Sequence, residues 1–341
     1  MPTIKDVAQA AGVSIATVSY ALNNRNDMIS DETLHHVVET AQRLGYTPNI
    51  TARNLKANRT RLIGYAWPHM PTEEPNWVLD QFMYFLAHAA EAVGYHLLTF
   101  TFPQDDPVPV YDDLIRSGRL DAFVLTETVM DDPRIPFLLK RQFPFVSFGR
   151  TTIADDFYWF DTDGKNGMAQ AVTHLVELGH KRIAMFGWPE SSLTGNFRMR
   201  GFLHGMSAAG LAIRDELIIR SDYLGDDVNR AFDLWLRLPR HEQPTAVISI
   251  SDFVAISVMR EAELRGYRIG ETLSVVGFDD VPFGKYLKPT LTTLRQPIME
   301  ITRAIISTLS DLLDNENVSL DQRLYSPQLI IRDSSGPPQK P

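Results

Sequence analysis

The sequence has no cysteine among its 341 residues, which excludes disulfide bonds and thiolate zinc sites and fits a reducing compartment. It has no apolar run of the roughly 18 to 20 residues that a membrane-spanning helix needs. It also has no signal-peptide layout at its start, because Lys5 and Asp6 are followed by an amphipathic pattern. These absences predict a cytoplasmic protein that has no membrane partner.

Motifs of the common enzyme classes are missing as well. No G-x-G-x-x-G run occurs, as a Rossmann dehydrogenase would need, and no Walker loop, G-x-S-x-G or H-E-x-x-H is found. His88, His174, His180 and His241 lie in unrelated segments. We therefore predict no catalytic residue, no metal site and no cofactor, and we expect that the protein is not an enzyme.

What the sequence does have is a globular composition with an uneven charge. Apolar residues make up 44% and charged residues 22%, which indicates folded domains, and the length favours two or three of them. Residues 1–61 hold seven basic and five acidic side chains, a net charge of +2, whereas the rest of the chain carries −11. A cationic front end on an acidic body indicates that only the N-terminal module binds a polyanion, although a solvated basic face near a linker would give the same pattern.

The opening stretch, TIKDVAQAAGVSIATVSYALNN, has the pattern of two short helices joined by a glycine turn. Thr3 can cap the first helix, which Gly12 ends by accepting a positive φ. Ser14 can cap the second helix, and Ser30 can cap a third that Gly45 stops. Each helix has one apolar face, so three helices that are too short to stand alone can share one small core.

The second of these helices presents a surface suited to DNA. Small, hydroxyl and aromatic side chains lie on or near its solvent side: Ile15, Ala16, Thr17, Ser19 and Tyr20. A helix that enters a DNA major groove carries such residues near its N-terminal end, where side chains reach base edges and the helix dipole meets phosphate. The pattern predicts a helix-turn-helix unit, but three helices that form a cap with another role would also fit it.

The segment YTPNITARNLKANRTRLIG follows this unit and combines a short helical pattern with basic residues. Ala52 and Leu55 fall on one side of the pattern, among arginine and lysine side chains. An exposed leucine flanked by cations can unstack a base step from the minor groove while the cations hold phosphates. An ordinary interdomain linker explains the segment equally well if it is considered alone.

Together, these two stretches closely resemble the N-terminus of the lactose-repressor (LacI/GalR) family of bacterial transcription regulators, without a gap from residue 3 to about residue 65. The resemblance implies base reading by Ile15, Ala16 and Tyr20, and minor-groove insertion by Leu55 beside Ala52. It also implies phosphate contacts by the following residues: Ser14, Thr17, Ser19, Asn23, Tyr46 and Asn49. Tyr20 departs from the family pattern, since arginine is frequent there, so the usual operator sequence is not expected.

From residue 61 onward, strand patterns alternate with helix patterns. RLIGYAW, HLLTFTF, DAFVLT and FPFVSFG are strand-like, and a second series runs through RIAMFG, ELIIRSD, PTAVISI and LSVVGF. Helix patterns lie between them, for example at residues 133–142 and 226–238. Repeated strand–helix units predict parallel sheets, and the two series divide near residues 160–164. We predict an α/β fold of two doubly wound subdomains with a cleft at their strand ends.

The chain is therefore expected to have four segments. They are a helix-turn-helix headpiece at 1–47, a hinge helix and linker at 48–60, an effector-binding and dimerisation domain at 61–333, and a disordered tail at 334–341. Within the domain, we assign about 61–161 and 291–320 to the first subdomain, and about 162–290 and 321–333 to the second. The end of the chain, IRDSSGPPQKP, is rich in proline, serine and glycine and has no heptad pattern, so a tetramerisation coil is not expected.

The body also resembles the effector domains of this family, and its fold resembles that of periplasmic sugar-binding proteins. The matching runs are DTDGKNGMAQAVTHLVELGHKRIAMFG, RMRGF and SDFVAISVM, the last followed by LSVVGFDDVPFGKYLKPTLTTLRQP. The headpiece argues against a transport receptor of this fold. The resemblance implies an effector-binding arginine at Arg198 and a ligand-binding carboxylate at Asp279, which together suit a polyol.

Five further residues are candidates for the effector site. Ser251 stands where relatives often carry asparagine, and Tyr223 can stack on a sugar. Trp67, Trp77 and Arg150 fall at strand ends or in loops that can line the cleft, although packing or surface roles explain these three equally well.

These features predict a dimeric repressor of carbohydrate-metabolism genes that binds a near-palindromic operator and is released by a sugar. The effector changes how the two subdomains meet, and thereby whether the paired hinge helices fit DNA. A nucleoside, or a phosphorylated partner protein that acts as corepressor, is the alternative to a sugar. An architectural DNA-binding protein without an effector is a third possibility, which a plugged cleft would favour.

Overall fold

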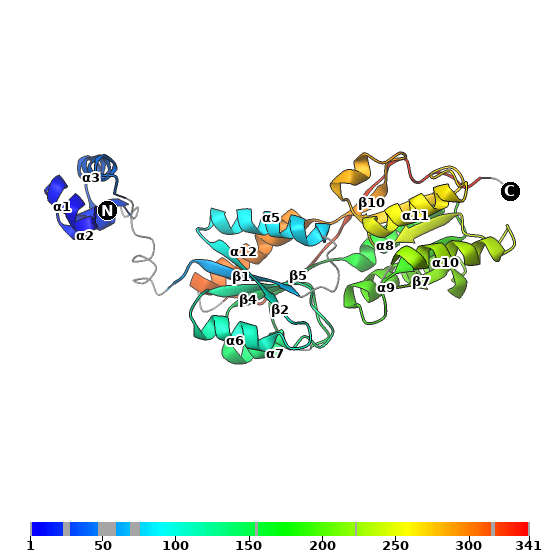
Figure 1. Ribbon diagram of the computed structural model, residues 1–341, viewed down its shortest axis with the longest axis horizontal. Coiled ribbons are helices and arrows are strands. Elements are labelled where there is room, and N and C mark those ends of the chain that lie inside the picture. The colour runs from blue at the N-terminus through cyan, green and yellow to red at the C-terminus, as the bar shows by residue number, and fades with distance from the viewer. Residues whose placement is uncertain are drawn as a thin grey trace. The chain divides into compact units, whose positions relative to one another are not determined.

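The computed structural model describes residues 2–22, 28–46, 59–68, 76–153, 156–221, 224–314 and 318–339. The chain forms two compact units, Met1–Arg61 and Leu62–Pro341 (Figure 1). Each unit has a hydrophobic core of its own. The predicted hinge helix at 48–60 falls almost entirely outside the described residues, as do the following candidates: Asn23, Asn49, Ala52, Leu55 and Tyr223.

In its described part, the first unit is a three-helix headpiece. Its helices are α1 (Ile4–Ala11), α2 (Ile15–Leu22) and α3 (Asp31–Arg43). Thr3 and Asp6 form a capping box at the start of α1, Gly12 ends this helix at φ 66°, and Ser30 caps α3. The shared core takes one fully buried valine from each helix: Val7, Val18 and Val37. The three helices stabilise one another as the sequence predicts.

Over the described ranges, the second unit consists of two lobes, each built on a six-stranded sheet. The first sheet has the order β11-β5-β4-β3-β1-β2, and its described pairs are parallel. Its strands are β1 (Leu62–Pro68), β2 (His96–Phe102), β3 (Ala122–Leu125), β4 (Phe145–Phe148), β5 (Trp159–Thr162) and β11 (Gln322–Tyr325). The second sheet has the order β12-β10-β9-β8-β6-β7, in which β12 pairs antiparallel with β10. Its strands are β6 (Ile183–Gly187), β7 (Ile218–Arg220), β8 (Ala246–Ser249), β9 (Ser274–Asp279), β10 (Thr292–Arg295) and β12 (Gln328–Ile330).

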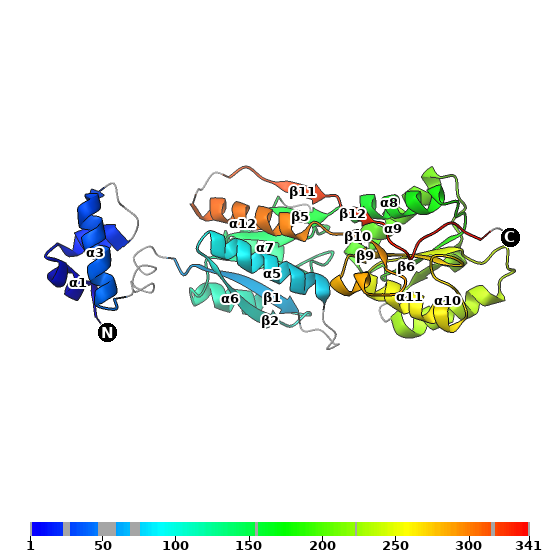
Figure 2. The same cartoon turned by 90° about the horizontal axis from the view of Figure 1, so that it is seen from above.

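Helices cover both faces of each sheet (Figures 1 and 2). In the first lobe, α5 packs with α12 on one face, and α6 and α7 lie on the other. In the second lobe, α8 packs with α9, and α10 packs with α11. Their bounds are α5 (Trp77–Ala92), α6 (Val108–Arg116), α7 (Arg134–Arg141), α8 (Gly164–Glu177), α9 (Leu193–Ala208), α10 (Leu224–Arg237), α11 (Asp252–Leu264) and α12 (Ile298–Asp314). Every described helix falls short of the length or the hydropathy that a membrane span requires. The predicted fold of two doubly wound subdomains is confirmed.

Within the described ranges, the chain crosses between the lobes at three points. It does so after β5, after β10 and after β11. We assigned 291–320 to the first lobe and 321–333 to the second, and both bounds are wrong by a few residues. The reason is that β10 pairs with β9 of the second sheet, whereas β11 pairs with β5 of the first. Strands of four residues carry too little pattern to reveal a partner that is distant in the sequence.

The predicted disordered tail at 334–341 is wrong for the part that the structure describes. Ser334 is fully buried, and its hydroxyl donates to the Val275 carbonyl at 2.6 Å while its carbonyl accepts from the Val275 N–H at 2.8 Å. His180, which is 1% exposed, bonds the Gly336 carbonyl through Nε2 at 2.8 Å. The proline and serine content wrongly indicates disorder here, because groups on the second lobe form hydrogen bonds with the backbone of the segment.

We expect His180→Ala to lower the free energy of unfolding by about 2 kcal/mol, because it removes a buried side chain and leaves groups of the C-terminal segment without partners. Thermal unfolding of the full chain measures the loss. His241→Ala is the matched control, since the His241 side chain is 81% exposed, and it should leave the unfolding temperature unchanged. Equal unfolding temperatures for the two variants would contradict a role of the C-terminal segment in the fold.

Candidate functional site

In the headpiece, α2 carries the predicted DNA-reading surface. Ser14 caps the helix by accepting a hydrogen bond from the Thr17 N–H at 3.0 Å, which fixes where the helix begins. Ser14, Ile15 and Ala16 are exposed, and Ile15 keeps 46% of its surface open. The remaining described candidates on this helix are half-buried: Thr17, Ser19 and Tyr20. The N-terminal end of α2 is therefore open to a partner.

The opposite side of α2 anchors this surface to the headpiece core. Val18 and Ala21 are buried against the other two helices. Tyr46, a predicted phosphate contact, packs partly against the same core, and its N–H donates to the Ala41 carbonyl at 2.9 Å. The reading surface thus rests on a packed scaffold, which keeps its side chains in a fixed arrangement.

In the second unit, the strand order indicates where a ligand site is expected. The order reverses between β1 and β3 in the first sheet and between β6 and β8 in the second. Open parallel sheets bind ligands at the carboxyl ends of such strands. Among the described residues, four buried side-chain polar atoms lack a hydrogen-bond partner. Three lie on these strands or directly after one, namely Tyr65 Oη, Thr126 Oγ1 and Ser249 Oγ, and the fourth, Arg198 Nε, comes from α9. Unsatisfied buried groups of this kind point to a ligand or an ordered water.

Arg198 extends from α9 across the carboxyl end of the second sheet. Its guanidinium stacks 3.6 Å above the Phe278 ring and donates to the Ile250 carbonyl. Nη2 of Arg198 lies 3.9 Å from Asp279 Oδ1. Burial lowers the pKa of Arg198, and the neighbouring Asp279 carboxylate opposes this shift. The ring fixes the guanidinium plane, so the Nε–H without a partner keeps a defined direction for an acceptor.

Asp279 ends β9 at φ 126°, a conformation that side chains rarely adopt. Its Oδ1 accepts a hydrogen bond from Gln296 Nε2 at 2.8 Å. Burial raises the pKa of Asp279, and Arg198 opposes the rise. Fully buried Asp252 supports the turn, because its Oδ2 accepts the Val281 N–H at 2.8 Å. The Asp279 carboxylate is therefore held in place before any ligand binds.

Gln296 connects this carboxylate with the region where the chain crosses between the lobes. Its Oε1 accepts from the Thr162 hydroxyl at 2.7 Å, and its Nε2 donates to Asp279. Gln296 and Thr162 are both buried, and each lies at a crossing point. The hydrogen bonds run in one direction, from Thr162 through Gln296 to the carboxylate. A change at Asp279 therefore alters a chain of bonds that ends at the crossing segments.

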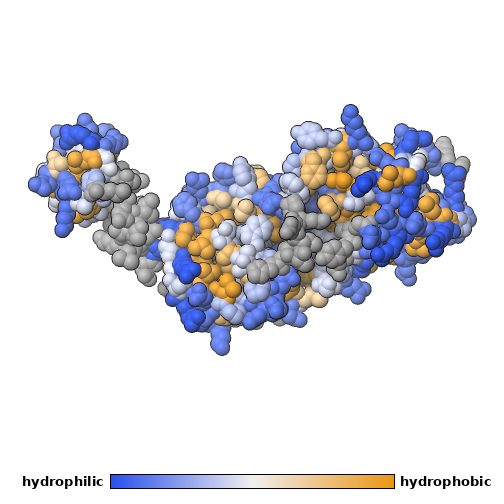
Figure 3. Space-filling model, viewed as in Figure 1, coloured by the Kyte–Doolittle hydropathy of each residue, from blue (hydrophilic) through white to orange (hydrophobic). Residues whose placement is uncertain are grey.

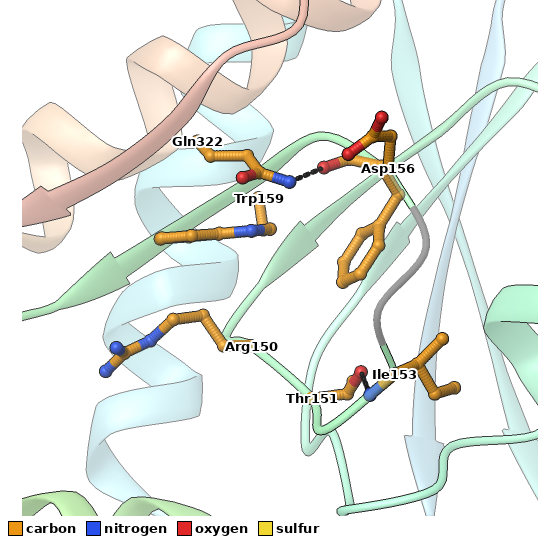
Figure 4. Close-up of a pocket in the computed structure, with 7 residues that line it drawn as sticks. Arg150, Thr151, Ile153, Asp156, Trp159 and Gln322 are labelled. Carbon is orange, nitrogen blue, oxygen red and sulfur yellow. Dashed lines mark hydrogen bonds between the residues drawn. The ribbon is translucent and has the colours of Figure 1, made fainter.

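Arg150, on the loop after β4, contacts α9 of the other lobe. Its Nε donates to Asp161 Oδ2 at 2.9 Å, and its guanidinium stacks 3.7 Å above the Phe197 ring. Figure 4 shows this side chain beside the Trp159 indole, at the edge of a cavity of about 210 Å³. Burial raises the pKa of Asp161, and Arg150 opposes the shift. Since Phe197 precedes Arg198 on α9, this interlobe contact lies next to the candidate ligand site.

A cavity of about 380 Å³ lies between α5 and the segment that follows β9. Apolar and aromatic side chains from both lobes form much of its wall: Trp77, Val78, Tyr84, Phe85, Val281 and Pro282. Its polar groups come from Asp80, Gln81 and Asp279. Trp77 packs edge-on against Phe283, with ring centroids 5.4 Å apart. Such a cavity suits a sugar, because a sugar ring has apolar faces and hydroxyl edges.

Two predicted effector residues have partners within the protein instead. Ser251 is 9% exposed and caps α11 by accepting the Val254 N–H. Trp67 is half-buried and packs edge-on against Tyr65, with ring centroids 5.1 Å apart. These contacts favour structural roles for both side chains.

The sequence prediction also missed residues that the structure places around the site. Gln296 bonds Asp279, Asp252 supports its turn, and Asp161 pairs with Arg150. All three lie at or just after the end of a strand, in the doubly wound pattern that we predicted. Polarity at strand ends was the available signal. Among the described residues, no group of three or more potential ligand side chains could hold a metal ion.

Comparison with known protein families gives two matches. Residues 3–49 match the model of bacterial regulatory proteins of the lacI family, and residues 172–335 match that of the periplasmic binding protein-like domain. The chain is 30% identical to the HTH-type transcriptional repressor CytR of Escherichia coli strain K12, over 98% of this chain and 96% of that protein.

Solved structures are similar as well. A regulatory protein of the LacI family from Chloroflexus aggregans has a TM-score of 0.76 at 40% identity, over 81% of this chain and 99% of that chain. The transcriptional regulator CelR in complex with cellobiose has a TM-score of 0.72 at 25% identity, over 98% of this chain and 100% of that chain. The lac repressor dimer bound to operator and the anti-inducer ONPF has a TM-score of 0.78 at 23% identity, over 98% of this chain and 99% of that chain, which shows a shared fold.

Ligand binding at this site should weaken as the pH falls below neutral. Because burial raises the pKa of Asp279, the carboxyl takes up its proton at a higher pH than an ordinary aspartate, and the protonated acid accepts fewer hydrogen bonds from hydroxyl groups. Titration calorimetry from about pH 5 to about pH 8 with a binding sugar measures the dependence. Asp279→Asn should bind weakly and lose most of this pH dependence, and the remainder belongs to Asp252, whose pKa burial raises to about 6. An unchanged pH dependence in that variant would assign the titration to another group.

Proposed function

Because the chain belongs to the lacI family of bacterial regulatory proteins, we propose that it represses carbohydrate-metabolism genes as an operator-bound dimer that a sugar inducer releases. It is a DNA-binding transcription regulator of the ligand-responsive repressor type. We place it in the cytoplasm and assign it no catalytic activity. The observation that supports the sugar effector best is the pairing of Arg198 with Asp279 at the carboxyl end of the second sheet.

The chemistry of the cleft favours a small polyol as effector. Arg198 offers donors and Asp279 offers acceptors, and the aromatic wall beside Asp279 can cover the apolar face of a sugar ring. The relative CelR was solved with cellobiose, which is such a ligand. An open cavity of about 380 Å³ between the lobes argues against an architectural protein that has no effector.

The proposed mechanism is linkage between the effector cleft and the DNA-binding headpiece. A sugar that contacts both lobes favours one arrangement of the lobes over the other, and it can shift the equilibrium only by this difference in affinity. Coupling energies of about 1–3 kcal/mol are typical, which corresponds to about 5- to 150-fold in affinity. Gln296 is placed to take part, because it bonds Asp279 and Thr162 at the crossing segments.

Apolar side chains on the second unit support the dimer. Figure 3 shows apolar patches among polar surface on the visible face of both lobes. Tyr84 on α5 is 60% exposed, and Phe253 and Leu264 on α11 are 52% and 71% exposed. Tyr286, which follows the short 3-10 helix η3 (Pro282–Lys285), is 82% exposed. In the proposed dimer, a second copy covers apolar side chains of this kind on α11 and after η3.

The proposed operator follows from the side chains at the start of α2. Ile15 and Ala16 cannot hydrogen-bond base edges, but they can contact thymine methyl groups. Tyr20 offers one hydroxyl where arginine would present two donors to guanine. We therefore expect half-sites that depend on thymine methyl contacts, arranged as a near-palindrome by the twofold symmetry of the dimer.

Selection of binding sites from random DNA tests this readout. The wild-type protein should show no strong guanine preference at the base pair that faces residue 20. Tyr20→Arg should introduce such a preference, with a discrimination of about 1–3 kcal/mol, because arginine binds guanine with two hydrogen bonds. If the selected base at that pair is the same for both proteins, α2 does not read DNA in the proposed orientation.

A thermal-shift screen with sugars tests the effector, since a ligand at about 100 times its Kd stabilises a protein by about 2.7 kcal/mol. Arg198→Ala should weaken the binding of an active sugar by at least about 100-fold, because the ligand oxygens then lose the guanidinium donors and Asp279 loses its neighbouring cation. Operator binding without sugar should stay within about threefold of wild type. Arg200→Ala is the control, because Arg200 is an exposed arginine on the same helix. A full sugar response in the Arg198 variant would move the site elsewhere.

A further inference from the structure

Glu127 occupies an unusual position at the switch point of the first sheet. It lies just beyond the carboxyl end of β3, and its φ of 51° falls in the left-handed region that favours glycine. A side chain in this conformation costs on the order of 1 kcal/mol. Glu127 is open to solvent, yet surrounding protein raises its pKa, while Arg134 opposes the rise. It therefore stands at the edge of the first sheet where ligands are expected to bind, and the strained backbone marks a position that is held there for use.

A buried ion pair holds the turn that carries Glu127. Arg134 is 2% exposed, and its Nη2 donates to Asp132 Oδ2 at 2.6 Å and to the Thr126 carbonyl at 2.9 Å. The same nitrogen lies 3.4 Å from the Glu127 carbonyl oxygen. Arg134 thus binds the backbone of the turn, and Asp132 neutralises its charge. The Glu127 carboxylate has no ion-pair partner among the residues that the structure describes.

Two buried hydroxyl groups beside Glu127 lack a hydrogen-bond partner of normal geometry. They belong to Tyr65 and Thr126, both of which are fully buried. Burial raises the pKa of Tyr65, and the charges of Glu127 and Asp80 raise it further. Tyr65 on β1 is in register with Val124 on β3, so it lies toward the same end of the sheet as Glu127. Asp80 in turn lines the interlobe cavity together with Asp279. Glu127 and Tyr65 therefore lie toward the carboxyl end of the first sheet, and Asp80 belongs to α5, the helix that follows β1 and lines the cavity.

The charge along this path is negative. Arg198 and Arg150, the guanidinium groups described at the cleft, each lie beside an aspartate that neutralises them. Asp80 and Glu127 have no ion-pair partner in the described ranges, and the described lining of the cavity includes no lysine, arginine or histidine. An anionic ligand group in the cavity would meet carboxylates and would find no free cation among the described lining residues.

We propose that Glu127 selects the effector by charge, so that the crevice accepts a neutral or aminated carbohydrate and rejects a phosphorylated or carboxylated one. Hydroxyl and ammonium groups donate hydrogen bonds, which the carboxylates of Glu127 and Asp80 accept. Ionised phosphate and carboxylate groups only accept, so they cannot satisfy these residues. The inference rests on the proposed function, because it specifies the charge class of the sugar effector.

The first experiment compares sugars of different charge on the full chain. The probes are glucose, galactose, cellobiose and maltose, then glucosamine and galactosamine, then glucuronate and galacturonate, and last glucose 6-phosphate and trehalose 6-phosphate. Thermal shifts and the affinity for selected operator DNA are measured with each probe. At least one neutral or aminated sugar should stabilise the protein and change DNA binding, and no acidic probe should do so.

The outcomes separate this inference from the proposed function. If an acidic probe stabilises the protein and releases DNA, the charge selection is wrong and the sugar-controlled repressor stands. If no neutral or aminated probe stabilises the protein, the inference fails. If no probe of any class alters DNA binding, the proposed sugar control fails with it.

The second experiment assigns the selection to Glu127. Glu127→Gln keeps the size of the side chain and removes its charge, so the ratio of affinities for glucose over glucuronate, or for the corresponding active pair, should fall by at least about tenfold. Glu91→Gln is the matched control, because Glu91 is an exposed residue of α5 in the same lobe and the variant has the same net charge. That control should keep the wild-type ratio. An unchanged ratio in a folded Glu127→Gln protein would remove Glu127 from the selection.

Discussion

Burial of the Arg198 guanidinium next to the Asp279 carboxylate is the interaction on which the organisation of the second unit depends. An arginine keeps its charge at any physiological pH, so the protein must replace the water that it loses. It does so with the Ile250 carbonyl, the face of Phe278 and the carboxylate at 3.9 Å. The protein does not replace every hydrogen bond to water, because the Arg198 Nε–H has no partner. In our proposal the effector accepts this hydrogen bond, which explains why a group that is costly to bury stands at the end of the sheet.

The backbone around Asp279 follows from the same requirement. Only glycine fits at position 277 on β9, since a Cβ atom there would come within 2.1 Å of Asp252 Oδ1. This space lets the buried Asp252 carboxylate accept the Val281 N–H at 2.8 Å and hold the turn after β9. The turn keeps Asp279 and Asp280 at positive φ, and Asp280 pairs with Arg295 at 2.7 Å. The run GFDD thus orients the Asp279 carboxylate through three local features: the space at Gly277, the buried Asp252 carboxylate beside it, and the strained backbone of the turn.

Local features of the sequence predicted the parts that form locally. Capping residues and apolar periodicity gave the headpiece helices, and alternating strand and helix patterns gave the two sheets. Features that depend on distant partners were missed. They are the pairing of β10 with β9, the pairing of β11 with β5, and the packing of the C-terminal segment that His180 binds. Arg198 and Asp279 came from resemblance to a family. Glu127 and Gln296 carried only the general signal of a polar residue after a strand, because their surroundings exist only after separate strands have assembled.

The contacts between the lobes explain how such a site can control a change of shape. Arg150 and Asp161 belong to the same lobe, so their ion pair survives when the lobes move, and only the stacking of Arg150 on Phe197 crosses the cleft. The Trp77–Phe283 contact is likewise a single edge-on ring pair. Contacts of these kinds contribute about 0.5–2 kcal/mol each. Their sum is close to the 1–3 kcal/mol or so that an effector typically exerts on a second site. These ring contacts are weak, and the buried hydrogen bond from Thr162 to Gln296 lies at the crossing segments. The arrangement of the lobes therefore stays within the reach of one bound sugar.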